Sequence, residues 1–152
     1  MKKAKLKNEQ RLFIPLTLPG LNDIILARSQ SKTFRRKGKT IRVDNYQKLK
    51  KEYESLIIST INLARIKPVE RAYFIFTWME RNKKRDPDNI AGGGRKLLMD
   101  SLVSAKIIPT DGWKHVSGWI DLFKVNANKS GVRTNFAHPH LLQMRIRMII
   151  IY

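Results

Sequence analysis

The chain has 152 residues, no cysteine, and 31 lysines and arginines against 12 aspartates and glutamates, which gives a formal net charge of +19 at pH 7. Its length suits one domain, and a hydrophobic fraction of 42% is enough for a core without disulfides. The composition excludes disulfides and thiolate metal sites, and no apolar run approaches the roughly 18 residues of a membrane-spanning helix. The Met-Lys-Lys start lacks the apolar core of a secretory signal. We therefore expect one cytoplasmic domain over residues 1–152, with no membrane partner and with nucleic acid as the first candidate ligand.

The N-terminal part is predicted to be a flexible start over residues 1–9 and a strand over residues 10–18, ended by Pro19-Gly20. Asn22 then opens a turn. Residues 28–43 carry seven lysines and arginines without any apolar period, so we interpret them as a basic loop that follows the phosphates of nucleic acid. A loop that is disordered in the free protein is compatible with the same role. The predicted DNA-binding residues of this loop are Arg28, Lys32, Arg35, Arg36, Lys37 and Lys39.

The next two elements have clear local signals. Asp44 and Gln47 have the spacing of a capping box, and apolar residues recur at helical intervals from Leu49 to Leu63, which predicts a long amphipathic helix that ends before Pro68. Residues 71–79 are rich in aromatic and β-branched side chains and are predicted to form a strand. Basic residues that follow this strand extend the predicted DNA-binding surface, which also includes Lys83, Lys84, Arg85 and Arg95.

The remaining elements complete an α+β domain. A helix is predicted over residues 95–106, after Gly92 to Gly94, because each glycine inside a helix costs about 1 kcal/mol. Strands are predicted over residues 116–125 and 142–151, joined by a loop over residues 126–139. The order of elements indicates a single domain with two main helices and a mixed or antiparallel sheet.

An acidic cluster lies between Arg81 and Val116, inside this basic protein. Its members are Asp86, Asp88, Asp100 and Asp111. Pro87 favours an extended backbone, on which residues two apart project to one side, so Asp86 and Asp88 can face a common point. Asp100 shares a helical face with Lys96, for which a surface ion pair is the plain alternative. Asp111 lies in a turn.

Carboxylate donors without a neighbouring histidine or cysteine suit Mg²⁺ or Mn²⁺. Such ions polarise a scissile phosphate, lower the pKa of an attacking water and stabilise the leaving oxygen. Lys96 can add positive charge near the transition state. An isolated Asp-x-Asp is a weak signal, usually explained by turn chemistry, but here it is flanked by Lys83, Lys84 and Arg85.

These residues resemble the RusA-like crossover junction endodeoxyribonucleases, the Holliday junction resolvases of phages and prophages. The similar segments, in the family's order, are Leu18 to Asn22, Arg85 to Asn89, Lys96, Leu98 to Leu102, and Asp111 to Lys114. Thr110 stands where many relatives have a further acid.

By position, the resemblance implies that Asp86, Asp88 and Asp111 are catalytic acids that bind the metal. Lys96 is then a catalytic basic residue and Asp100 a supporting acid at the metal. The resemblance further implies a RusA-like fold and a homodimer that uses magnesium to make paired, symmetric cuts in a four-way DNA junction during recombination and repair.

Two other functions remain open from the sequence. One is a non-catalytic nucleic-acid-binding module whose acids cap turns and pair with lysine and arginine. The other is a nuclease of the same fold that selects flaps or forks. The glycine run lacks the end of a Walker motif, so no nucleotide cofactor is expected. Trp119 is expected in the core, whereas Trp113 is left between core packing and base stacking.

Overall fold

The computed structural model describes residues 8–140 of the chain. They form an α+β domain with a mixed four-stranded sheet and a separate two-stranded hairpin, which confirms the predicted fold class. The elements in chain order are β1 (Gln10–Ile14), α1 (Leu21–Ser29), β2 (Lys32–Arg36), β3 (Lys39–Val43), α2 (Asn45–Leu63), β4 (Ala72–Glu80), α3 (Pro87–Ser104), β5 (Val116–Val125) and β6 (Gly131–Ala137).

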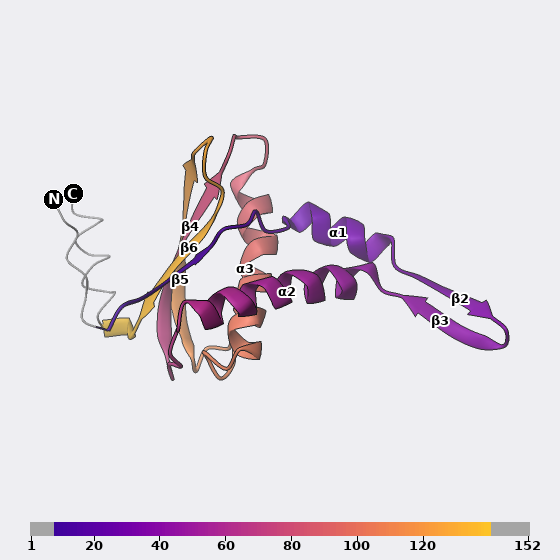
Figure 1. Cartoon of the computed structure of the whole chain (residues 1–152), viewed down its shortest axis with the longest axis horizontal. Helices are drawn as coiled ribbons and strands as arrows, with labels where there is room; N and C mark the ends of the chain where they lie inside the picture. The colour runs from indigo at the N-terminus through magenta and orange to yellow at the C-terminus, as the bar shows by residue number, and fades with distance from the viewer. Residues whose placement is uncertain (1–7, 141–152) are drawn as a thin grey trace.

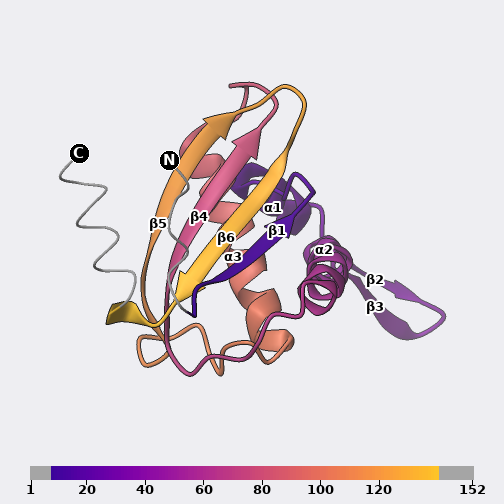
Figure 2. The same ribbon diagram turned by 60° about the vertical axis from the view of Figure 1, so that its left-hand side comes forward.

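The main sheet has the strand order β1-β6-β4-β5, in which only β4 and β5 run parallel. The α3 helix connects these two strands and lies with α2 on one face of the sheet (Figures 1 and 2). This β-α-β connection makes α3 begin just beyond the carboxyl end of β4. In open sheets, the carboxyl ends of parallel strands are where ligand sites usually form.

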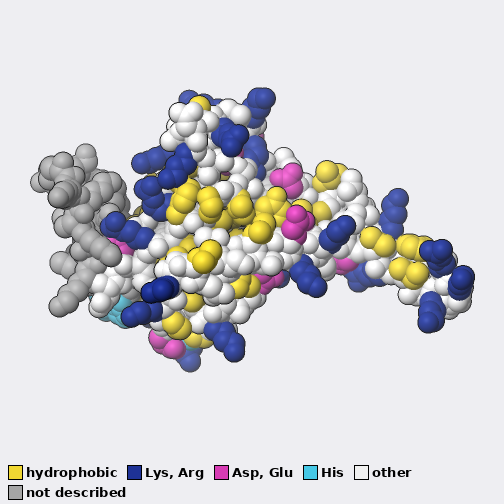
Figure 3. All heavy atoms as spheres, in the orientation of Figure 1, with side chains coloured by type: hydrophobic (Ala, Val, Ile, Leu, Met, Phe, Trp, Pro, Cys, Tyr) yellow, Lys and Arg dark blue, Asp and Glu magenta, His cyan; other side chains and the backbone are white. Residues whose placement is uncertain are grey.

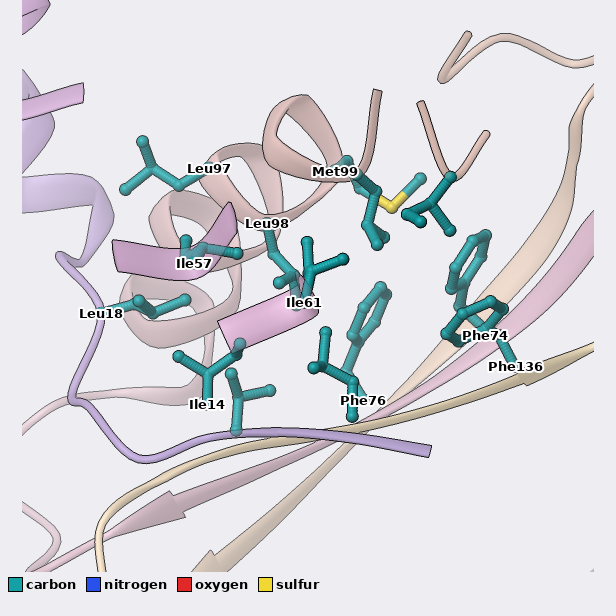
Figure 4. Packing of buried hydrophobic residues seen from close by; sticks show 14 of the residues in the cluster. Ile14, Leu18, Ile57, Ile61, Phe74, Phe76, Leu97, Leu98, Met99 and Phe136 are labelled. Carbon is teal, nitrogen blue, oxygen red and sulfur yellow. The ribbon is translucent and has the colours of Figure 1, made fainter. Parts of the chain in front are cut away.

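The core lies between the sheet and the two long helices (Figure 4). Phe74 and Phe76 of β4 are completely buried, and they pack with Phe136 of β6, Leu98 of α3 and Ile61 of α2 in one cluster. Burial of side chains of this size contributes about 1.5–3 kcal/mol each. The same contacts fix the direction of α3, which carries most of the predicted site.

Several predicted elements are confirmed. The α2 helix begins after Asp44, whose carboxylate accepts a 3.0 Å hydrogen bond from the amide of Gln47. The β4 and β5 strands match their predicted ranges within one residue. The β1 strand is shorter than predicted and ends before Pro15, which has no amide to donate. The predicted strand over residues 142–151 lies outside the described residues. Residues 1–7 of the predicted flexible start also lie outside them, whereas Glu9, which belongs to the same predicted segment, is buried.

The loop predicted over residues 126–139 is wrong, because most of it forms β6. Val132, Thr134 and Phe136 point inward and are buried, while Arg133 and Asn135 occupy the alternate positions. The strand pairs with β1 on one side and with β4 on the other. The alternation of inward-facing and outward-facing residues is present in the sequence, but only the pairing with strands on both sides makes β6 a central strand.

The basic loop predicted over residues 28–43 is also wrong. Residues 21–29 form α1, where a turn was expected at Asn22, and the rest forms the antiparallel β2–β3 hairpin. The hairpin turns at Lys37 and Gly38, both with positive φ (49° and 73°), as a tight two-residue turn requires. It projects from the body of the molecule (Figure 1), and every residue of both strands is exposed.

Gly92 to Gly94 lie inside α3 and not before it, which corrects the predicted helix start. A Cβ at Gly93 would lie 2.4 Å from the carbonyl carbon of Gly20, and a Cβ at Gly94 would lie 2.7 Å from the ring of Trp78. The glycines therefore let α3 approach both neighbours closely. This packing outweighs the low helix propensity of the run.

Candidate active site

Asp86 and Asp88 lie at the start of α3, beyond the carboxyl end of β4. Asp86 is the N-cap residue with an extended backbone (φ −71°, ψ 150°), and Pro87 occupies the first turn. Asp88 is already helical, so the expected extended Asp86–Asp88 pair is wrong: Pro87 lies in the first turn of the helix, where a proline is well tolerated. Both side chains are exposed at a helix N-terminus, where the helix dipole stabilises negative charge.

Neither carboxylate forms a hydrogen bond or ion pair with any residue of the described range. Asp86 does not use its side chain to cap the helix. All twelve acids of the chain lie between residues 8 and 140, and Glu52 on α2 is the only other one without such a partner. Two carboxylates without a described partner therefore lie close together in the sequence of a protein with an excess of cations.

Arg85 and Glu80 hold the segment that leads into Asp86. Two guanidinium nitrogens of Arg85 donate to the Glu80 carboxylate, at 3.2 and 2.6 Å, and a third donates to the Leu18 carbonyl at 2.9 Å. Arg85 was predicted to bind DNA, but each of its three guanidinium nitrogens already donates a hydrogen bond within the chain. Glu80 was not among the predicted site residues, because its only signal is its place at the end of β4.

Asn89 joins the start of α3 to the start of α1. Its side-chain oxygen accepts a 2.8 Å hydrogen bond from the amide of Asn22, and its side chain fills the space beside Gly20. The segments Leu18 to Asn22 and Arg85 to Asn89, far apart in sequence, are therefore neighbours. The role of Asn89 in joining two helices has no local signal in the sequence.

A second charged cluster surrounds Lys96 on α3. Its Nζ donates to Asp100 at 2.7 Å and to Asp111 at 3.2 Å, while Lys50 of α2 contacts the other oxygen of Asp100 at 2.8 Å. The hydrogen bond to Asp100 raises the pKa of Lys96 above its ordinary value; partial burial acts in the opposite direction, and the hydrogen bond to Asp111 raises the pKa further. Partial burial alone would raise the pKa of Asp100, but hydrogen bonds from Lys50 and Lys96 lower it. Lys50 was missed, because it comes from another helix.

The structure does not bring Asp111 together with Asp86 and Asp88. Lys96, which holds Asp111, follows Asp88 by eight residues on α3, or about 12 Å of helix axis. Ligand oxygens lie only about 2 Å from Mg²⁺, so one ion cannot reach both ends within a single chain. Between residues 8 and 140, no three histidine, aspartate or glutamate side chains form a group able to hold a metal.

The predicted DNA-binding residues fall into two classes. The first class has exposed side chains that form no ion pair or ring contact with a described residue, and it lies on the hairpin and in the loop after β4: Lys32, Arg35, Arg36, Lys37, Lys39, Lys83 and Lys84. Figure 3 shows basic side chains gathered at the hairpin end.

The second class makes contacts within the chain. Arg28 lies over the ring of Tyr46 at 4.5 Å. Arg95 forms an ion pair with Asp121 and lies 4.9 Å from the ring centre of Trp119. Trp119 is 49% exposed, so its expected place in the core is wrong. Arg95 covers one face of its ring, which a core position would have packed with apolar side chains.

Asp111 is exposed and belongs to the loop between α3 and β5, which lies at the opposite end of α3 from the loop that leads into Asp86 (Figure 1). Buried His115 anchors this loop, because its Nδ1 lies 2.7 Å from the carbonyl of Glu70. Trp113 is 92% exposed, which excludes the core alternative for this residue.

In the part of the chain that the structure describes, no helix is long and apolar enough to cross a bilayer. Comparison of the whole chain with models of protein families and with curated protein sequences gives no match. The resemblance to RusA-like resolvases therefore rests on the residues named above.

Proposed function

We propose that this protein is a metal-dependent DNA endonuclease that cuts branched DNA, with the four-way junction as its leading substrate. One observation carries the proposal: Asp86 and Asp88 are exposed beside Lys83 and Lys84 and have no hydrogen-bond or ion-pair partner among residues 8–140, in a chain of net charge +19. Carboxylates left without partners in such surroundings repel a DNA phosphate unless a cation joins them. The resemblance to RusA-like nucleases supports the same function.

The unpaired carboxylates suit a magnesium ion, which proteins commonly hold through one or two carboxylates, with water and substrate phosphate supplying the other ligands. Asp86 and Asp88 would hold it, and Mn²⁺ is an expected substitute. When bound, the ion activates water and neutralises charge on the phosphate. Within one chain, Asp111 and Asp100 would not hold this ion and would act through Lys96 instead.

The other residues bind and orient the DNA. Lys83 and Lys84 place positive charge beside the carboxylates, and the hairpin carries a second set of cations to a distant phosphate. The hydrogen bond to Asp100 raises the pKa of Lys96 above its ordinary value and so favours the protonated form further. Lys96 would therefore act as a fixed positive charge and not as a general base.

The decisive experiment incubates the protein with a labelled immobile four-way junction, with and without Mg²⁺, beside a linear duplex of the same sequence. We expect paired nicks in the junction alone, and only with the metal. Asp88→Asn should abolish cleavage and leave junction binding intact. Glu52→Gln is the matched control, because it removes the same charge from the other unpaired acid. Cleavage by Asp88→Asn at the wild-type rate would remove Asp88 from the mechanism.

Paired symmetric cuts require two active sites, so we propose a homodimer. Light scattering with and without junction DNA tests it. A monomer under both conditions would contradict the dimer and leave the metal site to be tested alone.

The distance between Asp111 and Asp88 keeps a second function open. In a non-catalytic nucleic-acid-binding module, the Lys96 cluster would only stabilise the fold. Tight junction binding without cleavage in either Mg²⁺ or Mn²⁺ would favour this module. Faster cleavage of flaps or forks than of the four-way junction would instead favour a flap or fork nuclease.

A further inference from the structure

A cavity of about 370 Å³ opens beside the candidate carboxylates, between the carboxyl ends of β4 and β5 and the start of α3. Its size falls within the range of roughly 300–1,000 Å³ that is typical of small-ligand sites. Asp86 and Pro87 line it from α3, while Phe123 and Val125 line it from β5. The proposed metal site explains none of this apolar surface.

The direction of Phe123 follows from its strand. Asp121 accepts a 2.9 Å hydrogen bond from Trp78 and pairs with Arg95 of α3, so it faces α3. Side chains alternate along a strand, and Phe123 therefore points to the same side as Asp121, whereas Leu122 points to the opposite side. Phe123 and Leu122 are equally exposed, at 40% each.

The walls of the cavity combine two kinds of chemistry. Phe123 supplies one aromatic ring, and Ile90 and Val125 add apolar side chains. Lys83 and Lys124 add positive charge, and neither forms an ion pair with a described residue. Glu80 and Arg85 also line it, but they neutralise each other.

An aromatic ring beside free lysines fits a nucleotide whose base is not paired. The base has an apolar face for Phe123, and the phosphates on either side carry charges for Lys83 and Lys124. A paired base in a duplex keeps both faces covered by its neighbours and cannot offer one to the ring. Asp86 shares the cavity wall, so a base held there would lie next to the proposed cleavage site.

We infer that this cavity binds one unpaired nucleotide of the DNA, with its base stacked on Phe123 and its flanking phosphates on Lys83 and Lys124. The inference rests on the proposed function for its DNA ligand, and it adds that the branch is recognised through an unpaired base. Proteins that bind unpaired strands commonly use such stacking, and its loss typically weakens binding by on the order of 10-fold per base.

The test measures binding in EDTA, so that cleavage does not enter. The probes are a duplex with one bulged 2-aminopurine and a fully paired duplex of the same length with 2-aminopurine opposite thymine. We expect the wild type to bind the bulged duplex about 10-fold more tightly and to quench its fluorescence. Phe123→Ala should lose both effects, Phe123→Trp should keep them, and Leu122→Ala should match the wild type.

Equal affinity for the two duplexes would overturn the inference, as would equal behaviour of Phe123→Ala and Leu122→Ala. Light scattering on the variants tests whether a second copy of the chain occupies the cavity instead. If Phe123→Ala turns a dimer into a monomer, the cavity belongs to the interface between two copies. Phe123→Leu keeps the apolar volume without the ring, so it replaces Phe123→Ala if that variant fails to fold. A preference for the bulged duplex that depends on Phe123 sustains the inference even if the protein never cuts the junction. Failure to cut the junction would defeat only the endonuclease proposal.

Discussion

Arg85 donates hydrogen bonds from two of its nitrogens to the carboxylate of Glu80, at 3.2 and 2.6 Å. Glu80 is the last residue of β4, and Arg85 directly precedes Asp86. The pair therefore closes the loop over residues 81–84 and sets the position of the first candidate carboxylate. Lysine cannot replace such a contact, because it has no planar fork of donors.

We expect Arg85→Lys to slow junction cleavage by about 10-fold or more and to change junction affinity by less than about twofold, because Asp86 is misplaced while the basic surface stays. Single-turnover cleavage and equilibrium binding separate the two effects. Lys84→Gln is the contrasting variant, which should weaken binding and leave the rate at saturation unchanged. A large loss of affinity in Arg85→Lys would show that Arg85 contacts DNA directly.

Gly93→Ala should destabilise the protein by about 1–3 kcal/mol, because its Cβ would lie 2.4 Å from the backbone of Gly20. Gly92→Ala is a control on the same helix, where the new Cβ would meet Leu21 at an ordinary 3.6 Å. That variant should be neutral or stabilise by up to about 1 kcal/mol through helix propensity. Urea unfolding measures both, and equal stability of the two variants would refute the close approach of α3 to Gly20.

Asp100→Asn should lower the free energy of unfolding by about 1–3 kcal/mol at neutral pH, because it weakens the hydrogen bonds from Lys50 and Lys96. Those bonds lower the pKa of Asp100 below its ordinary value near 3.8. The contribution of Asp100 is therefore present above pH 3.8 and is lost as the pH falls through its lower pKa in the folded state. Unfolding curves at a series of pH values should converge for the variant and the wild type in acid. A difference that persists unchanged there would have another cause.

The hairpin should contribute to DNA binding through charge alone. Glutamine at Arg35, Arg36, Lys37 and Lys39 should reduce the slope of log K against log salt by up to about 0.9 for each phosphate that the hairpin no longer binds. The same exchange at four exposed cations on and beyond α2 is the control; these are Lys48, Lys51, Arg65 and Lys67. Equal slopes for the two variants would mean that the hairpin does not follow the phosphates.

Local patterns were sufficient for elements whose signals involve only neighbours in the chain. Asp44 and Gln47 marked the start of α2, and the run of aromatic residues marked β4. Local patterns did not predict that Gly92 to Gly94 lie inside α3, because the close packing that requires glycine there involves Gly20 and Trp78, which are distant in sequence. Local patterns also failed for β6 because that strand exists through its pairing with β1 and β4.

The sequence by itself determined the large positive charge, the α+β class, and the concentration of carboxylates between Arg81 and Val116. Only the tertiary structure decided which carboxylates are free. Among the residues that the structure describes, it gave Asp86 and Asp88 no partner at one end of α3, and it placed Asp111 with Lys96 and Asp100 farther along. The physical reason is that charge and periodicity are properties of the chain itself, whereas a carboxylate is free or paired according to which side chains the packing of helix on sheet brings within a few ångströms.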